Sequence, residues 1–366
     1  MSKVTPLQHV EIYRDAHYNS FPSAVRLPDG SFRLSFRQAP DRRAAYDGMI
    51  THLDASSKGV SLSSKDGIVW DAAASVIWDD FFHGVQDPCL NVLSDGTLFA
   101  TYFTWKVYEE QDAPPLAERS SGAWTTAVQG RWVGQMAGTY SIRSTDGGAT
   151  WDRPLPAGLG DVAVRGNSVE LPDGAILTPF YGQEGDTHNV VVGRTVDRGQ
   201  TWERLAVLPG YEGQYHFHEP NLFRTAGGKV VLFIRSVKLE KTPGEEHLAS
   251  PLFTSESTDG GRTWSPVEMW PIYSPSPFNA LQLADGRVLL NYGYRLKPFG
   301  VRALVLDAEC TNLGSAEEFV VRDDGLGGDI GYTSAVQLAD GRVLITYYYY
   351  LADGVRFIAG SLCAVE

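Results

Sequence analysis

The chain has 366 residues, of which 43% are hydrophobic and 20% are charged, so it can bury a sizeable core and is not a disordered segment. Its formal net charge of −13 argues against a nucleic-acid backbone or an anionic membrane surface as a partner. No apolar run approaches the roughly 20 residues that span a bilayer. The N-terminal residues also lack the apolar segment of a signal peptide. We therefore expect a soluble, cytoplasmic protein.

A hairpin pattern occurs six times along the chain. Each copy has an apolar strand, a turn that usually contains Asp-Gly, and a second apolar strand, because Asp-Gly favours the positive φ of a tight turn. The six first strands with their turns cover residues 21–30, 88–96, 166–174, 219–228, 278–286 and 334–341. Copies spaced by roughly 55–80 residues indicate one supersecondary unit per period.

A second repeat falls between the hairpins and consists of a turn with Ser or Thr, then Asp, Gly and Trp. It covers residues 64–70, 144–151, 195–202 and 257–264. The Asp and Ser side chains can bond local backbone amides, Gly allows positive φ, and Trp anchors the turn in the core. We interpret these segments, called Asp boxes below, as structural and not catalytic.

The two repeats together predict an all-β fold. A hairpin followed by a hairpin with an Asp box makes a four-stranded antiparallel unit, and six such units arranged radially form a six-bladed β-propeller. After residues 355–364 the last unit is one strand short, while residues 9–14 form a strand without a unit. We predict that this N-terminal strand completes the last blade and that residues 1–366 form a single domain.

The Asp boxes and hairpins resemble those of the sialidase superfamily over nearly the whole chain. This resemblance is specific for the fold and weak for the activity. It implies an exo-glycosidase that hydrolyses a terminal acidic sugar, with a carbohydrate partner and no cofactor. Such enzymes use a tyrosine nucleophile activated by a glutamate, because a neutral phenol attacks poorly until a carboxylate takes its proton.

The candidate catalytic residues follow from where the hairpins start and end. In a propeller the inner hairpins of all blades begin and end at one mouth of the central channel, which is a default site. The resemblance implies that Tyr332, in the segment GYTS, is the nucleophile and that Glu219, in HEPN, is its base. A tyrosine replaces the usual carboxylate nucleophile because the substrate's own carboxylate would repel an anionic attacker.

The loop after Arg37 holds the candidates for the general acid. Asp41 and Asp47 flank the spacing that the resemblance implies, and His52 and Asp54 lie farther along the same loop. We expect Asp47, or otherwise Asp41, to protonate the leaving oxygen.

Several arginines match positions that bind the substrate carboxylate. Arg235 resembles the second such arginine, and Arg302 resembles the third, with Arg295 as an equally placed competitor. Asp87 matches an acidic position that contacts the substrate. The expected substrate-binding residues are Arg37, Asp87, Arg235, Arg295, Arg302, His218 and Asn279.

One position departs from the superfamily pattern. The first carboxylate-binding arginine should lie two residues before Pro22, where this chain has Ser20. A hydroxyl cannot replace the bidentate fork of a guanidinium group. We therefore expect that the substrate can be an acidic sugar other than sialic acid.

Two other functions remain open from the sequence. A polysaccharide lyase would use a His/Tyr pair, such as His218 and Tyr332, to abstract the proton beside a uronate carboxylate. A sugar-binding propeller would need no catalytic pair at all. The mouth histidines could hold a divalent metal, but no short ligand motif such as HExxH is present, so we predict no metal site. Three scattered cysteines suit neither a disulfide framework nor a zinc site, and we expect Cys89, Cys310 and Cys363 in the core.

Overall fold

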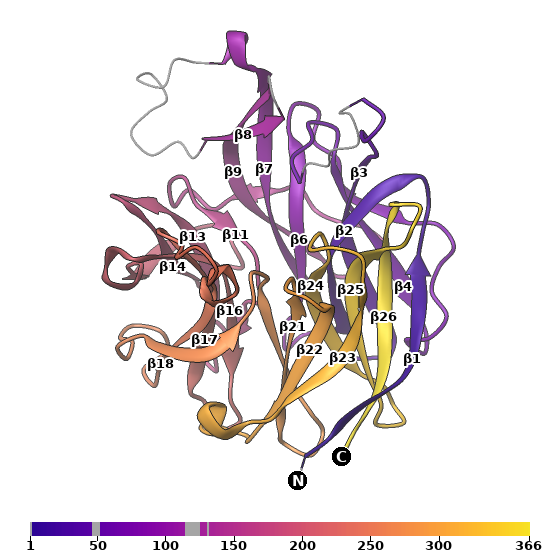
Figure 1. Ribbon diagram of the computed structural model, residues 1–366, viewed down its shortest axis with the longest axis vertical. Coiled ribbons are helices and arrows are strands. Elements are labelled where there is room, and N and C mark those ends of the chain that lie inside the picture. Colours follow the sequence, from indigo (N-terminus) through magenta and orange to yellow (C-terminus); the bar gives the residue numbers. More distant parts are fainter. Residues whose placement is uncertain (1, 46–51, 114–124, 130–131) are drawn as a thin grey trace.

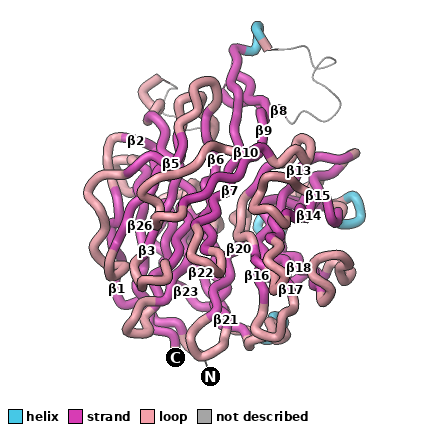
Figure 2. The backbone as a smooth tube through the Cα atoms, turned by 180° about the vertical axis from the view of Figure 1, so that it is seen from behind, coloured by secondary structure: helices cyan, strands magenta, loops and turns pink. Residues whose placement is uncertain are grey.

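Six antiparallel sheets make up the fold, which confirms the predicted six-bladed propeller. The computed structural model describes residues 2–45, 52–113, 125–129 and 132–366. Figure 1 shows the sheets following one another along the chain, and Figure 2 shows the same arrangement from behind, with strands as nearly all of the regular structure. The described helices are single 3-10 turns at Glu110–Asp112, Tyr211–Gly213, Glu246–Leu248 and Leu313–Ser315.

In each of the first three blades, the strands follow chain order from the channel outward. Blade 1 contains β2 (His17–Arg26), β3 (Phe32–Pro40), β4 (Lys58–Ser64) and β5 (Ser75–Trp78). Blade 2 contains β6 (Gly84–Val92), β7 (Leu98–Glu109), β9 (Trp132–Ser144) and β10 (Leu155–Pro156), with β8 (Thr125–Gln129) paired to β9. Blade 3 contains β11 (Ala163–Val164), β12 (Val169–Glu170), β13 (Ile176–Glu184), β14 (Thr187–Thr195) and β15 (Glu203–Leu208).

The last three blades follow the same order, and the N-terminal strand closes the ring. Blade 4 contains β16 (Tyr215–Arg224), β17 (Val230–Lys238), β18 (Pro251–Ser257) and β19 (Glu268–Tyr273). Blade 5 contains β20 (Phe278–Gln282), β21 (Val288–Tyr294), β22 (Phe299–Leu306) and β23 (Glu318–Gly325). Blade 6 contains β24 (Gly331–Gln337), β25 (Val343–Tyr350), β26 (Arg356–Val365) and β1 (Val4–Tyr13). Because β1 pairs with β26 along its whole length, the predicted closure by the N-terminus is confirmed.

Blade 3 differs from the predicted pattern, because its inner strand is split into β11 and β12. Gly166 lies in the gap with φ at +122°. A Cβ at this position would lie 2.0 Å from the carbonyl oxygen of Pro220 on the next blade. Only glycine permits this close approach, and the chain leaves the sheet where it occurs.

The Asp boxes stabilise turns between the outer strands, as predicted. Asp146 accepts hydrogen bonds from Ser144 Oγ (2.7 Å) and from the backbone nitrogen (2.9 Å) and hydroxyl (2.6 Å) of Thr150. A fifth turn of this kind, missed in the sequence, is built on Asp307, which accepts from the backbone and hydroxyl of Thr311. It lacks the Gly and Trp signature, so the pattern did not reveal it.

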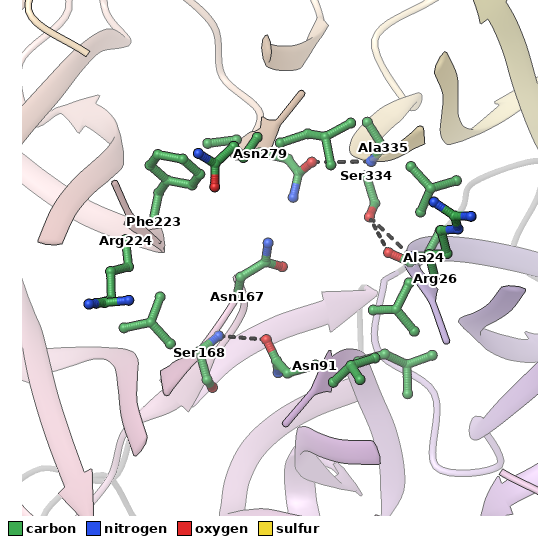
Figure 3. Close-up of a pocket in the computed structure, with 18 of the residues that line it drawn as sticks. Ala24, Arg26, Asn91, Asn167, Ser168, Phe223, Arg224, Asn279, Ser334 and Ala335 are labelled. Atoms are coloured by element: carbon green, nitrogen blue, oxygen red, sulfur yellow. Dashed lines mark hydrogen bonds between the residues drawn. The ribbon is translucent and has the colours of Figure 1, made fainter. Parts of the chain in front are cut away.

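Polar side chains tie several inner strands to the neighbouring blade and accept hydrogen bonds from backbone nitrogens at the strand edges. Figure 3 shows three of these ties around the channel. The backbone nitrogen of Ala24 donates to Ser334 Oγ (3.0 Å), that of Ser168 to Asn91 Oδ1 (2.8 Å), and that of Ala335 to Asn279 Oδ1 (3.1 Å). These bonds blunt the edges of the inner strands and fix the blades in register.

The channel opens at its far end into a cavity of about 910 Å³ that all six blades line. The three cysteines are buried thiols, as predicted. In the described part of the chain, no helix is long and apolar enough to cross a membrane.

Candidate active site

Four inner strands carry a bulge where they begin, at the mouth opposite the far cavity. The residue inside each bulge has a positive φ although it is not glycine. These residues are Phe21 (59°), Asp87 (50°), Glu219 (42°) and Tyr332 (54°). A left-handed backbone at a bulky residue is strained, and a bulge re-aims the side chain it carries. The strained backbone at these bulges therefore turns the four side chains toward the channel mouth.

Tyr332 and Glu219 meet across the channel from blades 6 and 4. The Tyr332 hydroxyl donates a hydrogen bond to Glu219 Oε1, and both side chains are buried. Arg235 Nη1 donates to Glu219 Oε2 and lies 3.3 Å from the Tyr332 hydroxyl oxygen. The predicted nucleophile, base and arginine are thus in direct contact.

The electrostatics of this pair keep the proton on Tyr332 and leave Glu219 ionised as its hydrogen-bond acceptor. Burial alone would raise the pKa of Glu219, but the charge of Arg235 and the hydrogen bond from Tyr332 lower it, so the carboxylate stays ionised. The pKa of Tyr332 is raised, first by burial and then by the Glu219 charge. The phenol therefore remains protonated until Glu219 takes its proton.

Two further arginines surround the Tyr332 ring. The guanidinium carbon of Arg295 lies 5.0 Å from the ring centroid, and that of Arg165 lies 5.2 Å from it. Arg295 donates to the Ile330 carbonyl (2.8 Å), and Arg165 is held in place by the carbonyl of Pro22 (2.9 Å). Both cations favour the phenolate form of Tyr332 when its proton leaves. The sequence placed Arg165 at the mouth, directly before the third hairpin, but assigned it no role, because no motif marks it.

The wall formed by blades 1 and 2 contains buried polar atoms without hydrogen-bond partners. Arg37 is fully buried, and none of its three guanidinium nitrogens has a partner in the described part of the chain. Ser20 pairs with Arg37 in the sheet, and its Oγ is also unpartnered. Unsatisfied buried charge costs free energy, so these atoms are candidates for contact with a polar ligand.

Asp87 projects from the same wall. Its Oδ1 is buried and has no partner among the described residues. Burial raises the pKa of Asp87 to about 7, although the Arg165 charge opposes the rise. Asp87 can consequently either donate or accept a hydrogen bond near neutral pH.

Asp329, which the sequence placed at the mouth without a role, binds four side chains beside Tyr332. It accepts hydrogen bonds from Tyr18 (3.0 Å), His52 (2.8 Å), Tyr348 (2.9 Å) and Arg356 (2.7 Å). Burial alone would raise its pKa, but the hydrogen bond and charge of His52 and the charges of nearby arginines hold it well below the usual range. The only sequence signal was an aspartate three residues before Tyr332.

Two of the predicted residues lie away from this cluster. Arg302 donates to the carbonyl of Arg322 (2.9 Å) and stacks over Tyr294 (4.3 Å) in the outer part of blade 5, so Arg295 takes the place beside Tyr332. Asp41 accepts two hydrogen bonds from Arg43 Nε (3.0 Å) and Nη2 (2.6 Å). These bonds lower the pKa of Asp41 and suit it poorly to donate a proton.

Asp47 lies outside the described residues. His218 packs against the rings of His188 (4.6 Å) and Tyr181 (5.7 Å) and pairs with Arg235 in the sheet. Among the described residues, no hydrogen bond or ring contact joins His218 to Tyr332. The His/Tyr pair of the lyase alternative therefore does not form through His218.

No group of three or more His, Cys, Asp or Glu side chains in the described ranges is arranged to hold a metal ion.

Asn279 lies deeper in the channel, level with Ala335, and acts there as a tie between blades 5 and 6. We expect Asn279→Ala to lower the free energy of unfolding by about 2 kcal/mol, because it leaves a buried backbone nitrogen without an acceptor. Denaturant unfolding would measure the loss. Asn167→Ala is the matched control, since the Asn167 amide projects into the open cavity and should change stability far less. Equal effects of the two changes would contradict the assignment.

The histidines of blades 3 and 4 should make stability depend on pH. Burial, with a smaller effect of His216, lowers the pKa of His188 from 6.5 to about 4. Between these values the unfolded chain binds a proton that the folded chain does not, so stability falls as pH falls through this window, by up to about 3 kcal/mol. His188→Gln should flatten the curve of unfolding free energy against pH. The exposed His247→Gln should leave it unchanged.

Comparisons with known proteins agree with this fold. The family described as BNR repeat-like domain matches residues 59–345. A crystal structure of a protein of unknown function from Dyadobacter fermentans is 33% identical over 99% of both chains, with a TM-score of 0.86. No curated protein matches the chain.

Two more distant structures share the fold. The NanB sialidase of Streptococcus pneumoniae is 12% identical over 96% of this chain and 70% of its own, with a TM-score of 0.65. An α-L-arabinofuranosidase from Fusarium graminearum is 12% identical over 98% of this chain and 97% of its own, with a TM-score of 0.63. On the family match and the Dyadobacter relative, this chain belongs to the BNR repeat-like family, with a six-bladed propeller similar in structure to sialidases.

Proposed function

We propose that this protein is an exo-glycosidase that removes a terminal acidic sugar by a retaining mechanism. The observation that carries the proposal is the direct hydrogen bond from Tyr332 to Glu219, with Arg235 donating to the carboxylate. A propeller that only binds sugar has no need of a buried phenol held by an ionised base. The shared fold with a sialidase and an arabinofuranosidase supports carbohydrate chemistry in general.

In the first step Tyr332 attacks the anomeric carbon while its proton passes to Glu219. The glycosidic bond breaks and its electron pair leaves with the aglycone oxygen. Arg235 and Arg295 stabilise the negative charge that develops on the tyrosine oxygen. Water then releases the sugar, and the proton on Glu219 returns to Tyr332.

The arginines of the site favour a substrate that carries a carboxylate. Arg37 is a buried cation without a hydrogen-bond partner among the described residues, and Arg235 and Arg295 lie at the nucleophile. A carboxylate satisfies guanidinium groups in fork geometry, which neutral sugars cannot do. Ser20 replaces the arginine of the sialidase pattern, so the substrate class is acidic sugars and not sialic acid alone.

The test is a panel of 4-methylumbelliferyl glycosides of N-acetylneuraminic, glucuronic and galacturonic acid, with α-L-arabinofuranoside as the neutral member. We expect fluorescence from at least one acidic glycoside. Proton NMR should show the first-formed sugar with the same anomeric configuration as the substrate. Turnover of the arabinofuranoside alone would contradict the acidic assignment, and an inverted product would contradict the tyrosine nucleophile. An unsaturated sugar product would indicate a lyase.

A further inference from the structure

His52 forms a pair with a buried carboxylate beside the nucleophile. Its Nε2 lies 2.8 Å from Asp329 Oδ1. The His52 side chain is 33% exposed, whereas Asp329 is 13% exposed. Within the described ranges, no hydrogen-bond partner is found for His52 Nδ1. One nitrogen of the imidazole is therefore fixed by the protein, and the other is available to a ligand.

The imidazole and the nucleophile pack on the same aromatic ring. The Phe21 centroid lies 5.1 Å from that of His52 and 4.5 Å from that of Tyr332. Phe21 is the left-handed bulge residue of β2, so the strained bend that re-aims it also holds His52 one ring away from Tyr332. Tyr18, Tyr348 and Arg356 donate hydrogen bonds to the same Asp329 carboxylate, and the charges of Arg295 and Arg37 also act on it.

A glycosidase reaction needs a proton donor for the leaving oxygen. Asp47 of this loop lies outside the described residues, and the two described carboxylates are already paired with arginines. Asp41 is held by Arg43, and Asp54 is held by Arg42. We infer that His52, oriented by Asp329, is the general acid and base of the reaction. This inference rests on the proposed function and assigns it a catalytic residue that the resemblance does not.

Over the two steps of the reaction, every proton that is given up is taken back. In the first step the imidazolium gives its Nδ1 proton to the aglycone oxygen as the glycosidic bond breaks, while the Tyr332 proton moves to Glu219. In the second step neutral His52 takes a proton from the attacking water, and the Tyr332 oxygen leaves with the proton of Glu219. The Asp329 carboxylate keeps its hydrogen bond to Nε2 and stabilises the imidazolium, in the way that a buried aspartate orients a catalytic histidine.

The experiment compares two glycosides of the acidic sugar cleaved in the panel, one with a 4-nitrophenyl and one with a methyl leaving group. His52→Gln should lower kcat/KM by about 100-fold or more for the methyl glycoside, which needs a proton on the leaving oxygen. The loss for the 4-nitrophenyl glycoside should be much smaller. Azide should accelerate release of the sugar by this variant, because azide attacks without the help of a base. Asp329→Asn should show the same dependence on the leaving group.

The matched control is His17→Gln. His17 also pairs with an aspartate at this mouth, at 2.9 Å from Asp15, but it makes no ring contact with Phe21. It should leave both rates unchanged. An equal loss on the two glycosides, or no loss, would show that His52 is structural or idle and would overturn the inference alone. Failure of the wild-type protein to cleave any glycoside would overturn the proposed function, and the role of His52 with it.

Discussion

Tyr332→Phe should lower kcat on an acidic glycoside by about 1,000-fold or more, with little change in affinity. The change removes one oxygen from a fully packed ring, so the Phe21 contact and the Arg295 contact stay in place. It deletes the attacking atom and leaves Glu219 with Arg235 as its remaining partner. Steady-state kinetics on the cleaved glycoside would measure the loss.

Two controls make the result interpretable. Tyr102 is also buried in the blade core, and its hydroxyl has no partner among the described residues, so Tyr102→Phe should not affect turnover. Glu219→Gln should cost about as much as Tyr332→Phe, and the double variant should cost little more, because the two groups act in one step. Wild-type turnover in Tyr332→Phe would refute the nucleophile.

Arg37→Met should raise the free energy of unfolding and weaken binding of the acidic sugar. A buried guanidinium group without a hydrogen-bonded partner costs several kcal/mol, and a well-packed apolar replacement commonly recovers about 1–4 kcal/mol. The same change removes a cation from the site, so affinity for the acidic sugar should fall by at least about 30-fold. Denaturant unfolding and calorimetric titration would measure the two effects.

The neighbouring Arg33 provides the control for these two opposite effects on stability and on sugar binding. It lies on the same strand, and its Nε donates to the carbonyl of Gly147 at 3.0 Å. Arg33→Met should therefore destabilise the protein and leave sugar binding unchanged. A loss of stability in Arg37→Met with unchanged binding would mean that Arg37 is a structural residue.

The contact between Tyr332, Glu219 and Arg235 could be predicted because each residue lies in a local motif at a fixed place in a repeated hairpin. Tyr332 and Glu219 begin equivalent inner strands, and Arg235 ends the hairpin that Glu219 opens. The bulges that aim them were foreseeable only in part. Proline follows the left-handed residue at Pro22, Pro88 and Pro220, but a proline alone does not reveal a positive φ.

The structure places other predicted residues away from Tyr332, because their positions depend on which face of a strand meets which neighbour. Arg302 and Arg295 were equivalent by spacing, and only the packing of blades 5 and 6 put Arg295 over Tyr332. Asn279 occupied a suitable place in the sequence, yet its oxygen is taken by a backbone nitrogen of the next blade. Asp41 was placed in a suitable loop, but Arg43 two residues later captures it.

The sequence by itself determined the six-bladed fold, because hairpins and Asp boxes are local patterns of turn chemistry and alternating strands that repeat along the chain. It also identified the tyrosine and the glutamate. Only the tertiary structure decided which groups surround them. Arg37 has no hydrogen-bond partner among the described residues, while Arg165 beneath the ring and Asp329 paired with His52 make contacts between different blades. They depend on the closure of the ring, which no local pattern records.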